Sequence, residues 1–254
     1  MTIIDINCDM GESFGAYTIG ADEEMMDLIS SANIACGMHA GDPNVMEQSV
    51  RLAKQKGVSI GAHPGFPDLS GFGRRMMDVT EEDVYRLTIY QIGALHAFCV
   101  VHDVRMNHVK PHGALYNLAA RDYRVARAIA KAVYEFDSSL ILVGLANSEI
   151  ITAGRDVGLT VAAEAFADRT YTSKGTLTPR SEEGALIERV EDAVQQIKQM
   201  VFEHKLRAAD GTLIHMKADT ICIHGDNKAA VTFARKLRMM LTDAGITVSS
   251  LSRM

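Results

Sequence analysis

The chain of 254 residues contains no tryptophan, and only 6% of its residues are aromatic. Sugar-binding sites commonly use aromatic rings for stacking, so this composition gives little support to a carbohydrate-binding surface. Lysine and arginine never occur more than two in a row, and the formal net charge is −6. This charge distribution argues against nucleic acid or an anionic membrane as the main partner, and we expect a small-molecule ligand.

Cysteine pairs and long apolar runs are absent as well. The four cysteines lie in or beside apolar runs without a C-x-x-C pair or zinc-finger spacing, which indicates reduced core residues. The first residues lead directly into a strand-like stretch without the basic, apolar and cleavage-site order of a leader. No apolar run approaches the roughly 20 residues that span a membrane. We therefore expect a cytoplasmic protein that contacts no membrane.

Apolar extended runs alternate with amphipathic stretches along the chain. Because parallel neighbouring strands need a crossover connection, this alternation favours a parallel α/β sheet. No linker-like tract or internal repeat divides the sequence, so we expect one domain over residues 1–254. The eight predicted strands, the last of them weak, are Ile3–Cys8, Ala32–Cys36, Val58–Ala62, Arg105–Val109, Leu140–Gly144, Leu159–Ala163, Thr220–Ile223 and Ile246–Ser250.

Four helices are predicted from their terminal signals. Asp or Thr at a helix start, proline at the first helical position and glycine at the end are the main ones. Acidic residues in the first turn add a favourable interaction with the helix dipole. The predicted starts are Asp42-Pro43, Thr80, Ser181–Glu183 and Asp226, and the first and last of these helices end at Gly57 and before Gly245.

The strand pattern fits either an open sheet or a closed barrel. An open Rossmann-type sheet normally carries a G-x-G-x-x-G turn after a strand, whereas here Gly71-Phe72-Gly73 continues with Arg74-Arg75-Met76. Polar candidate residues follow at least six strands, which suits the mouth of a barrel better than one crevice. We therefore predict a single-domain α/β fold of the (β/α) barrel type.

Histidines follow four of the predicted strands, where a parallel sheet presents its carboxyl edge. Asp9, His39 and His63 form one candidate set. Neutral imidazole and carboxylate groups can bind a divalent metal, activate water or move a proton. Hydrogen-bonded strand-end residues are the alternative for any single member, but four histidines at equivalent edges favour a site.

A lysine and a histidine stand together in Lys110-Pro111-His112-Gly113. At a barrel mouth, the lysine either holds an anion or, if desolvation lowers its pKa, carries a proton. His112 is either a functional group or the cap of a helix that begins near Gly113. The four-residue spacing from His108 is weak support for a zinc-binding helix, because Pro111 interrupts such a helix.

Two loops add acids and arginines. The run Glu164–Arg169 places two acids and an arginine after a strand, an arrangement suited to holding a substrate carboxylate and a base. A solvated ion pair is the alternative for Arg169. Arg74 and Arg75 pose the same choice in a glycine-rich loop. Asp226 is explained as a helix cap and is also a candidate for the site.

The chain resembles the LamB/YcsF family in six motifs that run in order from the first predicted strand almost to the C-terminus. Such a series is far more specific than any of the short patterns above. The resemblance implies a β/α barrel of the glycoside hydrolase/deacetylase type, usually seven-stranded and irregular, which would leave the weak eighth strand outside the closed sheet. The motifs are Asn7–Glu12, Ser31–Asp42, Gly61–Gly65 with Gly71–Arg75, Lys110–Asn117, Glu164–Arg169 and His224–Asp226.

The resemblance also implies an activity, the ATP-dependent opening of the lactam of 5-oxo-L-proline to L-glutamate, together with partner subunits B and C. The sequence has no G-x-x-x-x-G-K-[ST] phosphate loop, so we expect the partners to carry much of the ATP binding and phosphoryl transfer. Asp9, His39 and His63 are expected to bind or activate water, directly or through a divalent metal. Lys110 and His112 are expected to stabilise an oxyanion or relay protons. The expected substrate-binding residues are Glu12, Asn33, Arg75, Glu164, Asp168, His224, Asp226 and Arg169, the last on the substrate carboxylate.

Two other functions stay open at this point. A metal-dependent deacetylase or amidohydrolase acting alone fits the barrel and the Asp/His/His set, although Asn7-x-Asp9 stands where an amidohydrolase has H-x-H. A noncatalytic subunit that binds a carboxylate or a sugar also fits a polar rim. The sequence leaves homo-oligomer formation open.

Overall fold

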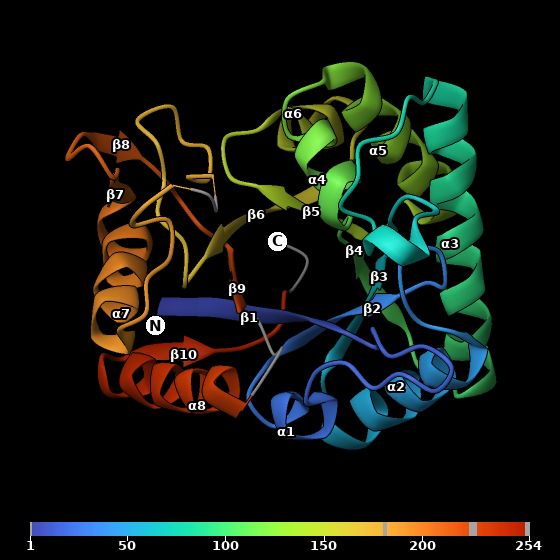
Figure 1. Cartoon of the computed structure of the whole chain (residues 1–254), viewed down its shortest axis with the longest axis horizontal. Helices are drawn as coiled ribbons and strands as arrows, with labels where there is room; N and C mark the ends of the chain where they lie inside the picture. The colour runs from blue at the N-terminus through green and yellow to red at the C-terminus, as the bar shows by residue number, and fades with distance from the viewer. Residues whose placement is uncertain (1, 180–181, 224–227, 252–254) are drawn as a thin grey trace.

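A computed structural model of the chain describes residues 2–179, 182–223 and 228–251. Seven parallel strands form a closed barrel, since β1 pairs with β2 on one side and with β9 on the other (Figure 1). β10 (Ile246–Val248) pairs with the beginning of β1, outside the closed sheet. The barrel strands are β1 (Thr2–Met10), β2 (Ser31–Ala35), β3 (Ser59–His63), β4 (Met106–Val109), β5 (Ile141–Leu145), β6 (Thr160–Phe166) and β9 (Thr220–Ile223).

All eight predicted strands are therefore present, and the predicted barrel fold is confirmed. The connections between strands carry the helices that surround the barrel in Figure 1. The described α-helices are α1 (Asp22–Met26), α2 (Pro43–Lys56), α3 (Glu81–Val101), α4 (Gly113–Ala119), α5 (Tyr123–Asp137), α6 (Glu149–Asp156), α7 (Val190–Lys198) and α8 (Lys228–Asp243).

The helix signals read from the sequence are confirmed at α2 and α3. The side chain of Asp42 accepts hydrogen bonds from the first-turn amides of α2, and Gly57 ends that helix with φ of 68°. Thr80 and Asp83 form a reciprocal capping box at the start of α3. The predicted cap at Asp226 lies outside the described residues.

Ser181 lies outside the described residues, but the helix start predicted at Ser181–Glu183 is wrong, because Glu182 and Glu183 are not helical and α7 begins at Val190. The preceding segment is held as a loop by backbone hydrogen bonds to the loop after β6. The amide of Thr170 donates to the carbonyl of Ala185, and the amide of Ile187 donates to the carbonyl of Asp168. These long-range bonds occupy the backbone that a local helix would need. A short hairpin was also not predicted; it consists of β7 (Lys205–Arg207) and β8 (Leu213–His215), joined to α7 by a π-helical turn at Gln199–Glu203.

Alternation along β1 separates two environments. Ile4, Ile6 and Cys8 are buried in the main hydrophobic core, whereas Asp5 and Asn7 make polar contacts with residues of other strands. Successive side chains of a strand point to opposite faces, so this pattern gives the barrel a polar interior. All four cysteines are buried and free, as predicted.

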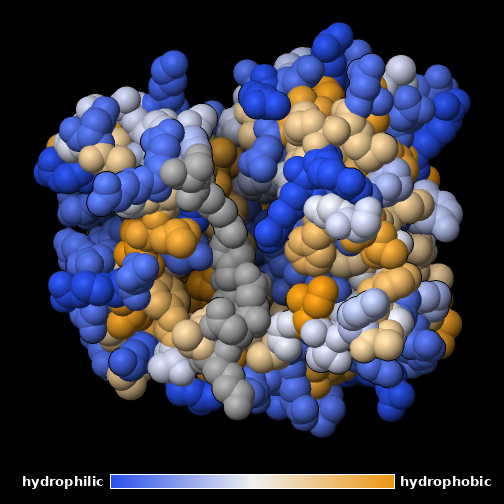
Figure 2. Space-filling view, in the orientation of Figure 1, coloured by the Kyte–Doolittle hydropathy of each residue, from blue (hydrophilic) through white to orange (hydrophobic). Residues whose placement is uncertain are grey.

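Within the described part of the chain, α3 is long and apolar enough by length and composition to cross a membrane. This departs from the expectation that no apolar run approaches that length. One such helix is weak support for a membrane span, because the core helix of a folded domain has the same composition. Here Val84, Ile92 and Leu95 of α3 are fully buried in the hydrophobic core around the barrel. The face seen in Figure 2 is mostly hydrophilic, with hydrophobic residues in separate patches.

Candidate active site

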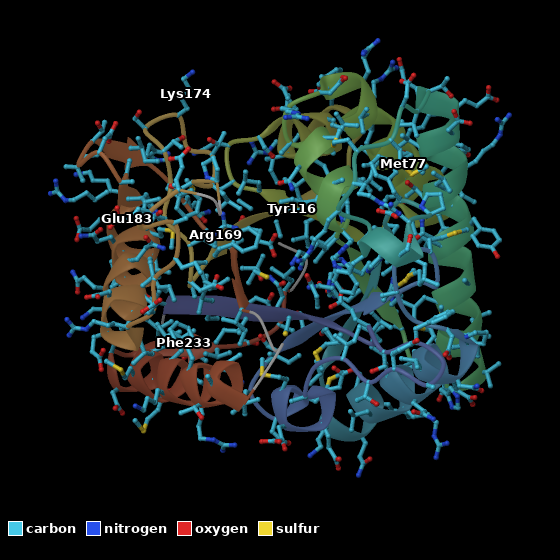
Figure 3. The ribbon with its side chains drawn as sticks, in the orientation of Figure 1. Met77, Tyr116, Arg169, Lys174, Glu183 and Phe233 are labelled. Atoms are coloured by element: carbon cyan, nitrogen blue, oxygen red, sulfur yellow. The ribbon has the colours of Figure 1, made fainter. Side chains whose placement is uncertain are left out.

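Most of the predicted site residues that the structure describes gather at the carboxyl ends of the barrel strands. A pocket with a volume of about 370 Å³ opens there, which we call the barrel-mouth pocket. Figure 3 places two of its lining residues, Tyr116 and Arg169, close together near the centre of the molecule. The lining residues that carry ionisable or hydrogen-bonding groups include Asp9, His63, Lys110, His112, Tyr116 and Arg169.

Lys110 is the centre of a buried ion cluster at the floor of the pocket. Its Nζ lies 2.8 Å from Glu164 Oε1 and 3.0 Å from Asp9 Oδ1, and it donates to Asn7 Oδ1 at 3.0 Å. Burial alone would lower the pKa of Lys110, but the charges of Asp9 and Glu164 outweigh burial and raise this pKa well above its usual value. The alternative of a lysine with a lowered pKa is therefore wrong, and Lys110 stays a cation.

Asp9 links this cluster to the histidines. Its Oδ1 accepts hydrogen bonds from Lys110 and Asn33, and its Oδ2 lies 3.2 Å from His63 Nε2. Burial would raise the pKa of Asp9, but His63 and Lys110 hold it well below its usual value. Asp9 is thus an ionised carboxylate that bridges a cation and an imidazole.

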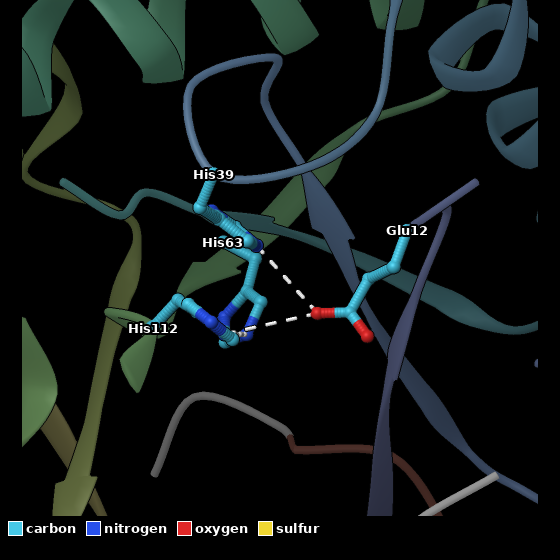
Figure 4. Close-up of side chains that lie close together, drawn as sticks. All are labelled: Glu12, His39, His63 and His112. Carbon is cyan, nitrogen blue, oxygen red and sulfur yellow. Dashed lines mark hydrogen bonds and ion pairs between the residues drawn. The ribbon is translucent and has the colours of Figure 1, made fainter. Parts of the chain in front are cut away.

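Three histidines and one glutamate form a second cluster beside Asp9, which we call the histidine cluster: Glu12, His39, His63 and His112 (Figure 4). The rings of His39 and His112 are stacked, with centroids 3.8 Å apart and an interplanar angle of 5°. Glu12 Oε1 lies 3.5 Å from His39 Nε2 and 3.7 Å from His112 Nδ1. One potential ligand atom from each of the four residues lies within 4.8 Å of the others.

Burial sets the protonation state of the stacked pair. His39 is fully buried, and desolvation together with the neighbouring imidazoles of His112 and His63 lowers its pKa well below 6.5. Desolvation is also the main cause that lowers the pKa of His112 to about 3, with a further contribution from His63. Both rings are therefore neutral near neutral pH, which is the form that binds metals and accepts protons.

Glycines in the family-like motifs make room for this packing. A β-carbon added at Gly65 would lie 2.6 Å from His39 Nδ1, and one at Gly73 would lie 2.7 Å from His39 Cβ. Gly73 also has a φ of 65°, which residues with side chains rarely adopt. These two glycines thus let the loop after β3 pack directly against His39.

His112 does not act as a helix cap. It occupies the cap position before α4, but its side chain makes no capping hydrogen bond. Instead, His112 Nε2 lies 2.8 Å from the carbonyl oxygen of Phe72, and Nδ1 lies 3.0 Å from His63 Nε2. The prediction that His112 precedes the helix is confirmed, but its side chain does not cap that helix, because the neighbouring loop holds the ring.

Two predicted substrate-binding residues lie inside the barrel. Glu164 is fully buried, accepts from the hydroxyl of Tyr116 at 2.6 Å through Oε2, and pairs with Lys110. Asn33 is also fully buried and donates to both Asn7 and Asp9. Glu164 therefore holds Lys110 in place, and Asn33 holds Asp9 in place, at the floor of the pocket.

Of the two arginines predicted to bind substrate, one lines the pocket and the other does not. Arg169 lines the pocket, is 7% exposed and donates to the carbonyl oxygen of Thr178. Arg75 is exposed, pairs with Asp68 and is not among the pocket-lining residues. Its neighbour Arg74 lines the pocket instead, with its guanidinium 5.1 Å from the centre of the Phe72 ring.

The remaining candidates lie at the edge or beyond the described residues. Asp168 is not among the pocket-lining residues, and its carbonyl pairs with the amide of Ile187. His224 and Asp226 lie outside the described residues. No role was predicted for Asn7 or Tyr116, although Asn7 shares the inner face of β1 with Asp9 and Tyr116 belongs to a family-like motif. That two-residue spacing along a strand was the available signal.

Fold and site together define a class of protein: an irregular seven-stranded (β/α) barrel with a histidine-rich polar site at the carboxyl ends of its strands. The model of the LamB/YcsF family matches residues 4–254. The chain belongs to this family.

Its relatives match over nearly their whole lengths. The 5-oxoprolinase A subunit of Halalkalibacterium halodurans is 57% identical over 252 residues, covering 99% of this chain and 98% of the relative. The protein of the same name from Bacillus subtilis is 56% identical, covering 98% and 97%. The crystal structure of the lactam utilization protein from Thermus thermophilus has a TM-score of 0.93 at 48% identity, covering 98% of this chain and 100% of that chain.

Proposed function

We propose that this chain is the lactam-opening subunit of an ATP-dependent 5-oxoprolinase, which converts 5-oxo-L-proline to L-glutamate while ATP is hydrolysed to ADP and phosphate. The observation that carries the proposal is the barrel-mouth pocket, which combines Arg169 with the buried chain Lys110, Asp9 and His63. The relatives named as the A subunit of 5-oxoprolinase support the same substrate. Their name also supports a complex with further subunits, here B and C.

The substrate offers two groups for this pocket to bind. 5-Oxo-L-proline carries a carboxylate, which suits the planar guanidinium of Arg169. Phosphorylation of its lactam oxygen places a negatively charged phosphoryl group at the ring carbonyl, and the cation Lys110 would hold that group. Asp9 and His63 face the same pocket with atoms that accept hydrogens, so they would orient the attacking water.

Coupling to ATP overcomes the resonance stabilisation of the lactam. A phosphoryl group transferred from ATP to the lactam oxygen releases ADP and makes the ring carbon more electrophilic. Water then adds to that carbon, the C–N bond breaks and the ring nitrogen takes a proton. The resulting acyl phosphate is hydrolysed by a second water to glutamate and phosphate. The sequence has no phosphate-binding loop of the P-loop type, so we assign the phosphoryl transfer mainly to subunits B and C.

The direct test measures glutamate formed from 5-oxoproline and ATP by this chain alone, then with subunits B and C added, omitting each component in turn. We expect activity only in the complete mixture. No activity in any mixture of properly folded components would overturn the assignment. Stoichiometric ATP hydrolysis with oxoproline by this chain alone would overturn the division of labour.

A stand-alone metal-dependent deacetylase is the second candidate, and the histidine cluster favours it. Such an enzyme would release acetate from an acetylated amine without ATP and without a partner. Assaying acetate release by the chain alone separates the two functions, because a component of a 5-oxoprolinase releases none.

A further inference from the structure

The hydrogen bonds of the histidine cluster fix the tautomers of two of its rings. His63 Nδ1 lies 2.7 Å from the carbonyl oxygen of Lys110, and His112 Nε2 lies 2.8 Å from the carbonyl oxygen of Phe72. A carbonyl oxygen only accepts hydrogen bonds, so each of these ring nitrogens carries a hydrogen. In the singly protonated form of each ring, the other nitrogen, His63 Nε2 or His112 Nδ1, then carries a lone pair.

These two lone pairs face each other, and further electron-rich atoms surround them. His63 Nε2 and His112 Nδ1 are 3.0 Å apart, a distance at which one of the two would normally donate a hydrogen. Asp9 Oδ2 lies 3.2 Å from His63 Nε2, and Glu12 Oε1 lies 3.7 Å from His112 Nδ1. Neither ring nitrogen of the fully buried His39 has a hydrogen-bond partner among the described residues. Such a group of acceptors is stable when a cation lies between them.

The spacing fits a metal ion better than a proton. A tetrahedral metal with bonds of about 2.0 to 2.1 Å holds its ligand atoms about 3.3 Å apart. The observed separations are 3.0 Å between His63 and His112, 3.5 Å between His39 and Glu12, and 3.7 Å between His112 and Glu12. A proton shared between His63 and His112 would leave Nε2 of His39 without a hydrogen-bond partner. A single cation bound by all four groups would give Nε2 of His39 a partner, once the stacked rings of His39 and His112 tilt so that their lone pairs converge on it.

We propose that Glu12, His39, His63 and His112 form a site for one divalent transition-metal ion, of the kind that accepts three imidazoles and one carboxylate. Zn²⁺ is the physiological candidate that this donor set suits. The carbonyls of Lys110 and Phe72 act as the outer shell, because they orient His63 and His112 toward the ion.

This ligand set differs from the Asp9, His39 and His63 set expected from the sequence. Glu12, and not Asp9, belongs to the group whose ligand atoms all lie within 4.8 Å of one another, so we assign Glu12 as the carboxylate ligand. Asp9 is a neighbour of the site, and its Oδ1 accepts from Lys110 and Asn33. A metal held beside Asp9 and the pocket would lower the pKa of a bound water molecule.

Metal binding by the purified full-length chain tests the proposal without substrate, ATP or partner subunits. After chelator treatment, we expect the chain to bind one Zn²⁺ and to give the intense visible bands of four-coordinate Co²⁺. X-ray absorption on the wild-type Zn²⁺ complex should report imidazole ligands, which requires no variant. A stoichiometry well below one for both metals, or a spectrum without imidazole ligands, would overturn the site.

Variants then identify the ligands. His39→Gln and Glu12→Gln should each weaken Zn²⁺ binding at least roughly 100-fold, because loss of a ligand exceeds the 10- to 100-fold effect of outer-shell changes. Asp9→Asn should weaken it less than about tenfold. His102→Gln is the matched control, since His102 pairs with Glu47 outside the barrel-mouth pocket and should bind as the wild type does. Circular dichroism confirms that each variant is folded.

Unchanged affinity in both His39→Gln and Glu12→Gln would overturn this ligand set, and so would a larger loss in Asp9→Asn than in Glu12→Gln. A chain that binds the metal as described but never forms glutamate would overturn the proposed function and leave the metal site standing. A chain that binds neither Zn²⁺ nor Co²⁺ while the complete enzyme still forms glutamate would overturn the metal site and leave the proposed function standing.

Discussion

At the scale of single residues, Lys110 joins carboxylates from two strands that are not neighbours in the barrel. Asp9 belongs to β1 and Glu164 to β6, and both lie within 3.0 Å of the Lys110 ammonium. Lys110 is 3% exposed and Glu164 is fully buried, so water cannot replace a lost partner. Removing one member of such a buried cluster leaves a charge without compensation.

Lys110→Met should therefore abolish glutamate formation and also lower the unfolding free energy by about 3 to 5 kcal/mol. Urea unfolding at neutral pH measures the loss. The double variant Lys110→Met with Glu164→Gln should recover part of it, because the uncompensated carboxylate is gone. Lys131→Met is the matched control: Lys131 pairs with Glu135 on the surface and is 59% exposed, so its loss should cost less than about 1 kcal/mol. Equal costs at the two lysines would contradict the buried cluster.

His108 makes stability depend on pH. It is fully buried in the barrel interior, and desolvation, with a smaller contribution from Lys110, lowers its pKa to about 3. Between this value and about 6.5, the unfolded chain binds a proton at this histidine that the folded chain excludes. The unfolding free energy therefore falls as the pH falls through this window, and the contribution of His108 is fully present only above it.

The slope of the unfolding free energy against pH should be smaller in His108→Gln. We expect a reduction of about 1.4 kcal/mol per pH unit between about pH 6 and about pH 4.5. The glutamine amide can still donate to Asn33, whose Oδ1 lies 2.8 Å from His108 Nε2. Chemical unfolding at a series of pH values gives the slope for both proteins. An identical slope in the variant would show that His108 is protonated in the folded state.

The sequence predicted which residues lie at the site. It did not predict which contacts their side-chain atoms make there. His39, His63, Lys110 and His112 were expected at the barrel mouth because each follows a strand, and the structure gathers them there. The exchange of Asp9 for Glu12 in the histidine cluster was not predictable. It depends on loop packing that brings Glu12 beside His39 and His112, and on Lys110, more than 100 positions from Asp9, which holds Asp9 Oδ1.

At the scale of secondary structure, helix-start residues were predicted correctly where their hydrogen bonds are made to the first turn of the same helix. Asp42 is the clearest case, since its Oδ1 accepts from the amides of Asn44 and Val45 at the start of α2. Its Oδ2 also accepts from the amide of Gly15, in the loop after β1. One side chain thus fixes a helix start and the loop that follows Glu12.

Asp42→Ala should lower the unfolding free energy by about 1 kcal/mol, the typical cost of losing an N-cap. Asp42→Asn should lose less than Asp42→Ala, because its amide oxygen still caps α2 and only the hydrogen bond from the Gly15 amide is lost. Thermal unfolding of the three proteins provides the comparison. A loss in Asp42→Asn as large as in Asp42→Ala would contradict the capping explanation, because asparagine keeps the oxygen that caps the helix.

Elements that depend on distant contacts could not be predicted. Ser181–Glu183 has the composition of a helix start, but the following segment is pinned to the loop after β6, as the bridge between Arg169 and Leu186 shows. The hairpin of β7 and β8 has strands of three residues, too short for alternation to be read from the sequence. In contrast, the barrel strands were found because each is a buried apolar run bounded by turn residues.

At the scale of the whole molecule, the barrel interior changes character along its axis. The carboxyl ends of the strands carry the pocket, the ion cluster and the histidine cluster. Elsewhere, a separate small apolar cluster of Ile141, Val143 and Ala162 from β5 and β6 packs against Leu251 after β10. In barrels of this type, residues away from the carboxyl face contribute to stability, and residues at that face contribute to chemistry.

Leu251→Ala should therefore lower stability without affecting the site. Leu251 is partly buried, so we expect a loss of about 1 kcal/mol in unfolding free energy, below the cost for a fully buried leucine. Zn²⁺ affinity and glutamate formation in the complete mixture should match the wild type at a temperature where both proteins are folded. Leu213→Ala serves as the control, because Leu213 is 57% exposed and should change none of the three measurements. A loss of Zn²⁺ affinity in Leu251→Ala would show instead that the C-terminal segment and the histidine cluster are coupled through the barrel.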